Sequence, residues 1–521
     1  MPPYPRPLPA SRPRVPAPEP FTRSEGLFLG LVAAVFIASV WRYLGLDFWY
    51  DEVFTLTNYV FVPLGRTVTD YSFPNNHVLY SLANNLGLRL AGIGTLFRLM
   101  DLPWVARLLP LACSAGTAGL LYAAARREFD RFTAQASVAV LTTTIPFLNV
   151  ACQVRGFSLS MLLLTALLWC YWRFERRPAP GRAAAVAALV ALALYTIPLS
   201  LYFIICLAAL PLARLVRRPR GRDLHDRERQ SRAARLLLSL AAGAALAALL
   251  YAPVLGEVTG NRFVRSQGLF NATTLLGTMP RVLGHFMAPR YLLWAVVAGA
   301  PVAWVLARQR SPAFTGGRLL QLVLLLLGPF FLSFVRGDQP WQRVFVNLAP
   351  VFALLVAACL HVLLDAIPRL RRFAFPVLLG LLVYCAAMSR VGTNTVRGRL
   401  LQDIETGNRS QDVYYNYYLA YYHPNRLLAR FARDRDPLIP VVLHDVDWAA
   451  LPAYADKHGV AVLGPDALDG VLQQHGRAYV VAAGAPRFLA LVRQRYPGFT
   501  ARSLYPEPDF HSIFLVSRAP R

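Results

Sequence analysis

The segment LFLGLVAAVFIASV at residues 27–40, followed by WRYLGLDFWYDE at 41–52, decides the fold class of this chain. Its first fourteen residues are almost entirely apolar, and an aromatic belt of Trp41, Tyr43, Phe48, Trp49 and Tyr50 follows them. Aromatic side chains collect where a membrane-spanning helix meets water. A cleaved signal peptide would instead end in a small-residue cleavage site, which this segment lacks. We therefore predict an uncleaved membrane span.

The composition of the whole chain agrees with a membrane protein. Of the 521 residues, 56% are hydrophobic and 16% are charged, whereas a soluble globular protein has about 25% charged residues. The 54 basic residues exceed the 28 acidic ones by 26, but they interrupt apolar runs. Membrane topology therefore explains the charge better than a nucleic-acid partner does. The six cysteines lie in or beside apolar runs, and we predict no disulfide framework.

Ten further apolar runs have about the length that a helix needs to cross the hydrocarbon core of a bilayer. They lie near residues 105–125, 134–150, 157–172, 183–196, 200–215, 236–255, 291–307, 319–335, 344–365 and 373–390. The pair between 183 and 215 is ambiguous, because Pro198 could join two short helices or lie within one long span. The pattern predicts a polytopic α-helical membrane protein with about 11 transmembrane helices.

Arginine-dense loops predict the orientation, because Lys and Arg concentrate in cytoplasmic loops. Five alternate loops are rich in arginine, namely 126–131, 173–182, 214–235, 308–318 and 369–372. The opposite loops are sparser, namely 45–104, 151–156, 256–290 and 336–343. Residues 1–24 are rich in Pro and Arg and predict a disordered cytoplasmic tail. We expect a multi-pass protein of the bacterial inner membrane, with a cytoplasmic N-terminus and an extracytoplasmic C-terminal part.

The composition changes after Arg390. Short β-branched runs at 440–443, 460–463 and 478–481 alternate with helical stretches, which predicts a small extracytoplasmic α/β domain over residues 391–521, after a transmembrane domain over 25–390. A tyrosine-rich connector precedes the first run, with Tyr414, Tyr415, Tyr417, Tyr418, Tyr421 and Tyr422. We interpret these tyrosines as an interfacial belt; a sugar-stacking platform is the alternative.

The first outside loop, 45–104, holds the most informative polar residues. Asp51 and Glu52 follow the first span directly, where charged groups are costly unless something uses them. A solvated helix N-terminus is the alternative, since acidic residues are favoured in a first turn. Further along, apolar residues at helical spacing predict an amphipathic helix on the outer membrane surface; they are Val78, Leu79, Leu82, Leu86 and Leu90.

Asn75, Asn76 and His77 come at the start of that helix, where free backbone N–H groups favour an anion. Helix capping is the alternative for Asn76. Arg155 and Arg343 lie in two other outside loops, and a lone arginine there is usually a lipid-headgroup contact. The joint pattern is more telling, because carboxylates, a histidine and arginines at one membrane face are what a reaction between a lipid-borne phosphate and a polar acceptor requires.

These motifs resemble those of the bacterial glycosyltransferase family 39 and its relatives. The resemblance is carried by TyrAspGlu at 50–52, AsnAsnHis-x-LeuTyr-x-Leu at 75–82, Arg155, and Arg343 followed by Pro350. The relatives are GT-C membrane transferases, which include the protein O-mannosyltransferases and the lipid A aminoarabinose transferase. Relatives often carry His-Pro-Pro-Leu at 76–79 and Arg-Tyr at 343–344, where this chain has Asn-His-Val-Leu and Arg-Val.

The resemblance implies an inverting glycosyltransferase that moves a sugar from a polyprenyl-phosphate donor to an acceptor hydroxyl at the extracytoplasmic membrane face. It implies that Asp51 is the general base and that Glu52 orients the acceptor or holds the loop. The expected phosphate ligands are Arg155, Arg343, His77 and Arg265. The expected acceptor or sugar ligands are Asn75, Asn76 and Tyr50.

No metal or other cofactor is predicted, although Asp51, Glu52 and His77 could together hold a divalent cation. The expected partners are the polyprenyl-phosphate sugar, membrane lipid and an acceptor that is a protein, a lipid or a glycan, with no nucleic acid. Two other classes remain as alternatives. A transporter or lipid flippase would carry charged or broken segments at mid-membrane in matched halves. A non-catalytic scaffold for envelope assembly would have no use for the acidic pair.

Overall fold

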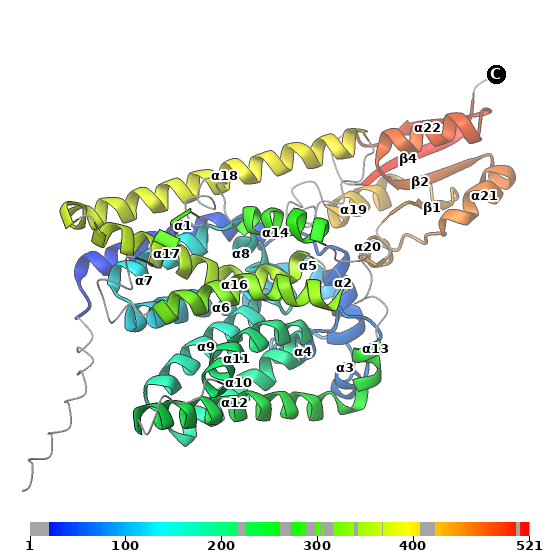
Figure 1. The fold of residues 1–521 in the computed structure, drawn as a ribbon. Helices are drawn as coiled ribbons and strands as arrows, with labels where there is room; N and C mark the ends of the chain where they lie inside the picture. The colour runs from blue at the N-terminus through cyan, green and yellow to red at the C-terminus, as the bar shows by residue number, and fades with distance from the viewer. Residues whose placement is uncertain are drawn as a thin grey trace, which may run out of the picture.

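The computed structural model describes residues 20–216, 224–260, 272–286, 316–337, 342–366, 368–406, 423–446, 449–506 and 511–519, and a few positions between 298 and 305. A bundle of helices forms one part, and a small domain with a β-sheet lies at one end of it (Figure 1). This arrangement confirms the predicted polytopic helical fold with a small C-terminal α/β domain.

Seven helices of the described residues are long and apolar enough to cross a membrane. They are α1 (Arg23–Val40), α6 (Pro103–Glu128), α9 (Phe157–Arg176), α12 (Leu224–Leu250), α16 (Gly316–Arg336), α17 (Ala349–Ala366) and α18 (Ala374–Thr406). Two shorter apolar helices, α10 (Pro180–Thr196) and α11 (Leu201–Val216), settle the ambiguous pair as two helices joined by the turn η3 (Pro198–Ser200).

One predicted span is interrupted. Residues 134–150 form α7 (Arg131–Thr143) and α8 (Ile145–Val150), because Thr144 has an extended backbone between them. Pro146 explains the break, since it lacks the N–H that a continuous helix would need at this position. The predicted span at 291–307 falls largely outside the described residues, so the total of eleven spans stays a prediction.

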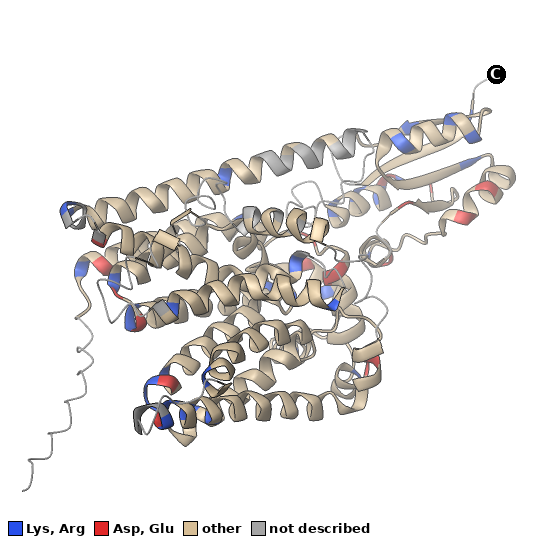
Figure 2. Cartoon of the chain, viewed as in Figure 1, with Lys and Arg blue, Asp and Glu red and all other residues tan. Residues whose placement is uncertain are grey.

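The two ends of the bundle differ in what they carry. The end that we call the loop face carries the segment 45–104 and the C-terminal domain, and the opposite end, the arginine face, carries Arg126, Arg176, Arg214 and Arg318. Figure 2 shows charged residues mostly toward these two ends, with few in the middle of the bundle. Apolar side chains of α6, α9, α10, α16 and α17 form the main core between them.

The loop segment folds into short helices. They are α2 (Tyr50–Thr55), the π-helical turn η2 (Leu56–Val60), α3 (Leu64–Thr69), α4 (Val78–Leu90) and α5 (Leu96–Asp101). The predicted amphipathic helix is α4, where Leu86 and Leu90 are exposed, whereas Tyr80, Asn84 and Asn85 are buried. Its exposed leucines thus lie on the side facing away from the protein, as a helix resting on a membrane surface requires.

The C-terminal domain contains a four-stranded sheet in the order β1-β2-β4-β3, with β1 parallel to β2 and the other pairs antiparallel. Its elements are α19 (Pro424–Asp434), β1 (Val441–His444), α20 (Ala450–Lys457), α21 (Leu468–His475), β2 (Arg477–Ala483), α22 (Ala485–Arg495), β3 (Phe499–Ser503) and β4 (His511–Arg518). The predicted run at 460–463 joins β1 through a single bridge from Leu463. The tyrosine-rich connector, 414–422, lies outside the described residues.

The C-terminal domain is docked on the loop segment. The Phe48 backbone N–H donates to the Tyr454 hydroxyl at 2.7 Å, and the Asn425 N–H donates to the Asp47 carboxylate at 2.8 Å. Lys457 pairs with Asp101. The long helix α18 runs past the predicted domain boundary at residue 391 and reaches α22 (Figure 1). These contacts place the domain directly above the predicted catalytic loop.

Candidate active site

The acidic pair lies at the start of α2, and its two carboxylates point to different sides. Consecutive residues of a helix do not face each other, because each is turned about 100° from the last. Asp51 and Glu52 are 4% and 2% exposed, so neither is a solvated first-turn residue. A buried carboxylate requires partners, and each of the two has its own set.

Asp51 is surrounded by donors from three separate segments. Its Oδ2 accepts from Arg155 Nη1 at 2.5 Å and from Arg343 Nη1 at 2.7 Å, and its Oδ1 accepts from Asn75 Nδ2 at 2.9 Å. Burial raises the pKa of the Asp51 carboxyl, but the two arginines outweigh burial and hold the pKa below its ordinary value. The carboxylate is therefore ionised at neutral pH and can accept a proton.

The two arginines reach Asp51 from different parts of the chain. Arg155 comes from the turn between α8 and α9, where its guanidinium also lies 5.2 Å from the centre of the Phe157 ring. Arg343 comes from η5 (Gln342–Leu348), just before α17, and its side chain is 23% exposed. The structure thus brings together residues that are 104 and 292 positions from Asp51 in sequence.

His77 lies directly before α4 and is locked against the start of α9. Its Nδ1 accepts the Gly156 backbone N–H at 2.8 Å, and its ring packs edge-on to Phe157. Burial, with the charges of Arg155 and Arg343, lowers the pKa of His77 well below its ordinary value. The ring is therefore neutral at pH 7, and because Nδ1 is an acceptor, Nε2 carries the hydrogen.

The remaining predicted ligands fall in different places. Asn75 contacts both Asp51 and, at 3.4 Å, Arg155. Asn76 is fully buried and its amide donates to the Thr67 and Asp70 carbonyls, so it holds the loop together; its role as a sugar ligand stays a prediction. Tyr50 is 37% exposed and stacks on Phe54. Arg265 lies outside the described residues.

Glu52 holds the loop segment to the bundle. Its Oε1 accepts the Val154 backbone N–H at 2.8 Å, its Oε2 accepts the Trp49 N–H at 3.2 Å, and Arg107 lies 3.5 Å away. Burial raises the pKa of the Glu52 carboxyl above its ordinary value. These contacts fit the loop-holding role that was one of its two predicted roles.

Arg107 is a residue that the sequence reasoning missed. It is 3% exposed and also donates to the carbonyl oxygens of Tyr43 and Asp47, so it ties the end of the first span to α6. The sequence did indicate its importance, because a lone arginine inside an apolar run normally pairs with another residue in the protein interior. No sequence pattern indicated that the partner is Glu52.

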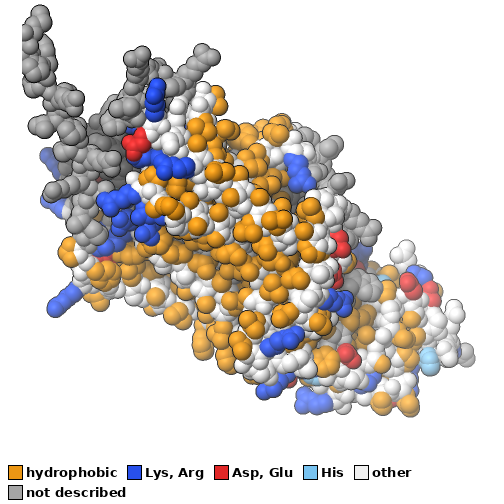
Figure 3. Space-filling model, turned by 90° about the horizontal axis from the view of Figure 1, so that it is seen from below, with side chains coloured by type: hydrophobic (Ala, Val, Ile, Leu, Met, Phe, Trp, Pro, Cys, Tyr) orange, Lys and Arg blue, Asp and Glu red, His pale blue; other side chains and the backbone are white. Residues whose placement is uncertain are grey.

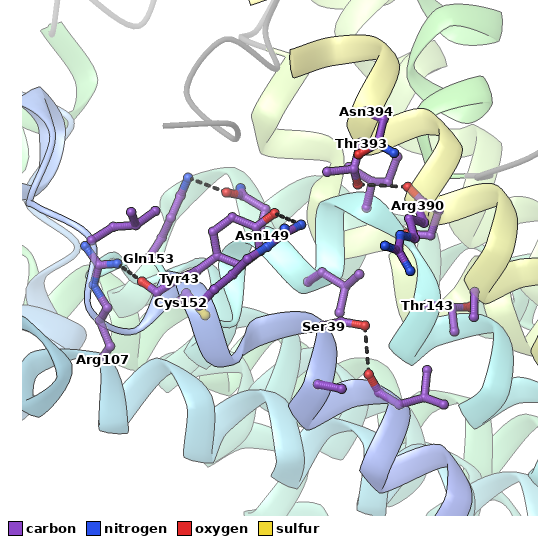
Figure 4. A pocket seen from close by; sticks show the side chains of 18 of the residues that line it. Ser39, Tyr43, Arg107, Thr143, Asn149, Cys152, Gln153, Arg390, Thr393 and Asn394 are labelled. Atoms are coloured by element: carbon purple, nitrogen blue, oxygen red, sulfur yellow. Dashed lines mark hydrogen bonds between the residues drawn. The ribbon is translucent and has the colours of Figure 1, made fainter. Parts of the chain in front are cut away.

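A cavity of about 750 Å³ adjoins Glu52. Its walls come from α1, α8 and α18, and Figure 4 shows Ser39, Asn149 and Arg390 from these three helices around it. The volume falls in the range of small-molecule sites. The lining is partly polar and partly apolar: Val35, Ala38, Ser39, Arg42, Tyr43, Leu46, Trp49, Glu52, Arg107, Thr143, Ile145, Leu148, Asn149, Cys152, Gln153, Ala386, Ala387, Ser389, Arg390, Thr393 and Asn394.

The described residues contain no group of three or more His, Cys, Asp or Glu side chains placed to hold a metal ion. The alternative trio of Asp51, Glu52 and His77 is already engaged by arginines, backbone amides and Gly156 respectively. Metal independence stays a prediction. All six cysteines are free thiols.

The fold is that of a GT-C-like polytopic membrane protein, as the sequence motifs predicted. Residues 90–225 match the family model described as dolichyl-phosphate-mannose-protein mannosyltransferase. The whole fold is similar to ArnT from Cupriavidus metallidurans bound to undecaprenyl phosphate, with 15% identity, a TM-score of 0.55, and 95% of this chain and 99% of that chain covered. The apo ArnT structure gives the same identity and coverage with a TM-score of 0.53. No protein of curated function matches the sequence.

Proposed function

We propose that this protein is an inverting glycosyltransferase that moves a sugar from a polyprenyl-phosphate donor to an acceptor hydroxyl. The observation that carries the proposal is the buried Asp51 carboxyl group held between Arg155 and Arg343 at the loop face. A carboxylate beside two cations supplies both a base for the acceptor and ligands for a phosphate leaving group. The ArnT-like fold supports the same conclusion, because one of those ArnT structures holds undecaprenyl phosphate.

The proposed reaction is a single displacement at the anomeric carbon. The acceptor oxygen forms a bond to that carbon while the bond from carbon to the phosphate oxygen breaks. The acceptor proton passes to Asp51, and the electron pair leaves with polyprenyl phosphate. Arg155, Arg343 and the neutral Nε2–H of His77 would stabilise the charge that develops on the phosphate.

The arginine contacts suggest how donor binding prepares the base. Before binding, Arg155 and Arg343 keep the pKa of Asp51 low, which makes it a weak base. A donor phosphate competes for the same guanidinium groups, so part of their charge turns from the carboxylate to the phosphate. The pKa of Asp51 then rises, and its basicity increases only when a donor is present.

The 750 Å³ cavity is the proposed acceptor side of the site. Glu52, which follows Asp51 in the chain, lines it together with Arg42, Arg390 and apolar residues of α1 and α18, which suits an acceptor with both polar and apolar parts. The loop face would be extracytoplasmic, because the arginine-dense loops lie at the opposite end. The C-terminal domain would then sit over the site on the extracytoplasmic side.

The test is release of free polyprenyl phosphate by the purified protein from a panel of polyprenyl-phosphate sugars, with crude envelope as acceptor. We expect turnover of one sugar and its loss by at least about 100-fold in Asp51→Asn, since general-base catalysis contributes about 10² to 10⁴. Asp70→Asn is the matched control, because Asp70 lies in the same loop and contacts Ser72 and Arg66 outside the site. An active Asp51→Asn enzyme would refute the assignment.

A further inference from the structure

A second cavity, of about 330 Å³, lies at the arginine face, at the opposite end of α9 from Asp51. The 20 residues of α9 separate the two sites by about 30 Å. Ends of α9, α11, α12 and α16 form the walls of this second cavity. Its lining residues are Glu175, Arg176, Leu210, Arg214, Arg229, Arg232, Ala233, Leu236, Gly317, Arg318 and Gln321.

Positive charge is in excess around this cavity. Glu175 pairs with Arg214 at 2.6 Å and with Arg318 at 2.5 Å. Glu128 pairs with Arg176 at 2.8 Å. Arg232 pairs with a further acidic residue, Glu228. Among the residues that the structure describes, five lining arginines thus meet three glutamates, which leaves an excess of two positive charges.

Arg229 is the fifth lining arginine and carries part of this excess. It lies on α12, one helical turn from Arg232 and Ala233, and is exposed. It makes no ion pair with any residue that the structure describes, although it lines the cavity. Removing its charge therefore breaks no described contact that the fold depends on.

Gln321 adds a buried polar group to the wall of the cavity. It is 2% exposed, and its Oε1 accepts from Trp172 Nε1 at 2.7 Å and from Arg318 at 3.3 Å. Both neighbours are donors, so the orientation of the amide is fixed with its oxygen toward them. Among the residues that the structure describes, the buried Nε2 group has no acceptor within hydrogen-bond distance, and the Tyr171 hydroxyl is a neighbour just beyond it. A buried N–H with a poorly placed acceptor is costly, and an anion in the cavity would offer it a further oxygen.

The surface beside the cavity is apolar. Leu212 and Val216 of α11 and Leu238 of α12 are 53%, 76% and 70% exposed. Figure 3 shows a largely hydrophobic face that is bordered at one end by Lys and Arg. The cavity thus lies where the headgroup region of a membrane would meet water, accessible both to a lipid headgroup and to a free anion.

We propose that this cavity binds a phosphate group, carried either by an anionic lipid headgroup or by a soluble phosphate compound. Arginine guanidinium groups and the Gln321 amide are donors that match phosphate oxygens. The site is separate from the proposed sugar-transfer site and uses none of its residues.

The full-length protein serves for both arms of the test. In the first arm, inorganic phosphate is titrated into protein in a neutral detergent by calorimetry. In the second arm, the protein is reconstituted in nanodiscs of phosphatidylcholine with or without phosphatidylglycerol, and retained lipid is identified by native mass spectrometry. Arg229→Gln is the test variant. Arg235→Gln is the matched control, because Arg235 is an exposed arginine of the same helix that does not line the cavity.

We expect Arg229→Gln to weaken binding by about tenfold or more, as the loss of one charge-assisted hydrogen bond predicts, and Arg235→Gln to leave it unchanged. Selective retention of phosphatidylglycerol by the wild type would identify a lipid source. Binding of inorganic phosphate without lipid enrichment would identify a soluble source, and both results support the site. Equal weakening by the two variants, or no binding of either probe, would overturn the proposal.

Discussion

The replacement Gly156→Ala tests how closely the site depends on the packing of two loops. Gly156 precedes α9 with φ −71° and ψ 2°. Alanine also adopts this conformation, so the replacement introduces no backbone strain. An added Cβ would, however, lie 2.6 Å from His77 Cβ and 2.9 Å from His77 Nδ1. Carbon atoms in favourable contact are about 3.5–4.0 Å apart, so one loop must move by about 1 Å.

That movement would act on both neighbours of Gly156. It would stretch the 2.8 Å hydrogen bond from the Gly156 N–H to His77, and it would displace Arg155, which contacts Asp51 at 2.5 Å. Overpacking of this kind costs about 1–3 kcal/mol of stability. A misplacement of about 1 Å at a reacting centre costs about 100-fold in rate, so we expect kcat to fall by about that factor.

The assay is release of polyprenyl phosphate together with thermal unfolding in the same detergent. Gly87→Ala is the control, because Gly87 lies inside α4, the helix that begins after His77, and an added Cβ there meets nothing within 4 Å. The control should keep full turnover and gain up to about 1 kcal/mol, since alanine is favoured over glycine in a helix.

Two results would contradict this reasoning. If Gly156→Ala keeps both the melting temperature and the turnover of the wild type, the close approach of His77 to Gly156 is wrong. If only the melting temperature falls, the contact is structural and the proposed dependence of catalysis on the position of Arg155 is refuted.

Two further predictions concern the same network, and a third concerns the docking of the C-terminal domain. Arg155→Ala should raise the KM for the lipid donor, and an unchanged KM would move the phosphate site elsewhere. Folding lowers the pKa of Asp51, so the ionised carboxylate stabilises the fold above the unfolded pKa of about 3.9, and this stabilisation is lost as the pH falls through the lower folded pKa. The difference in melting temperature between wild type and Asp51→Asn should therefore be constant from about pH 5 to 8 and shrink in stronger acid. Tyr454→Phe should destabilise the protein by about 1–3 kcal/mol, since it leaves the buried Phe48 N–H without its acceptor; an unchanged unfolding temperature would show that this contact does not hold the C-terminal domain in place.

The position of the site was foreseeable, whereas its internal geometry was not. Asp51, His77, Arg155 and Arg343 were singled out because they lie together at one membrane face and match the motifs of the family that the sequence resembles, and the structure brings all four into one cluster. The arginine contacts that set the pKa of Asp51 depend on how α9 and η5 pack against α2. A linear pattern contains no information on those distances.

Other features depended on tertiary contacts alone. Asn76 lies in the predicted motif, yet its side-chain amide donates hydrogen bonds to the Thr67 and Asp70 carbonyl oxygens. The break at Thr144 follows from Pro146. A proline within an apolar run can also lie inside a continuous helix, however, as Pro110 does in α6. Hydropathy averages over such local alternatives, so it predicted one span where the chain forms two short helices.

The sequence by itself determined the class of fold, because every helix that crosses a lipid bilayer must carry about twenty apolar residues whatever its neighbours are. It also placed the polar residues at one end of the spans. Only the tertiary structure decided that Asp51 faces two arginines, whereas Glu52 accepts backbone amides and lines the 750 Å³ cavity. The physical reason is that hydropathy is a property of each segment, whereas the partner of a buried charge is set by packing between segments that are distant in sequence.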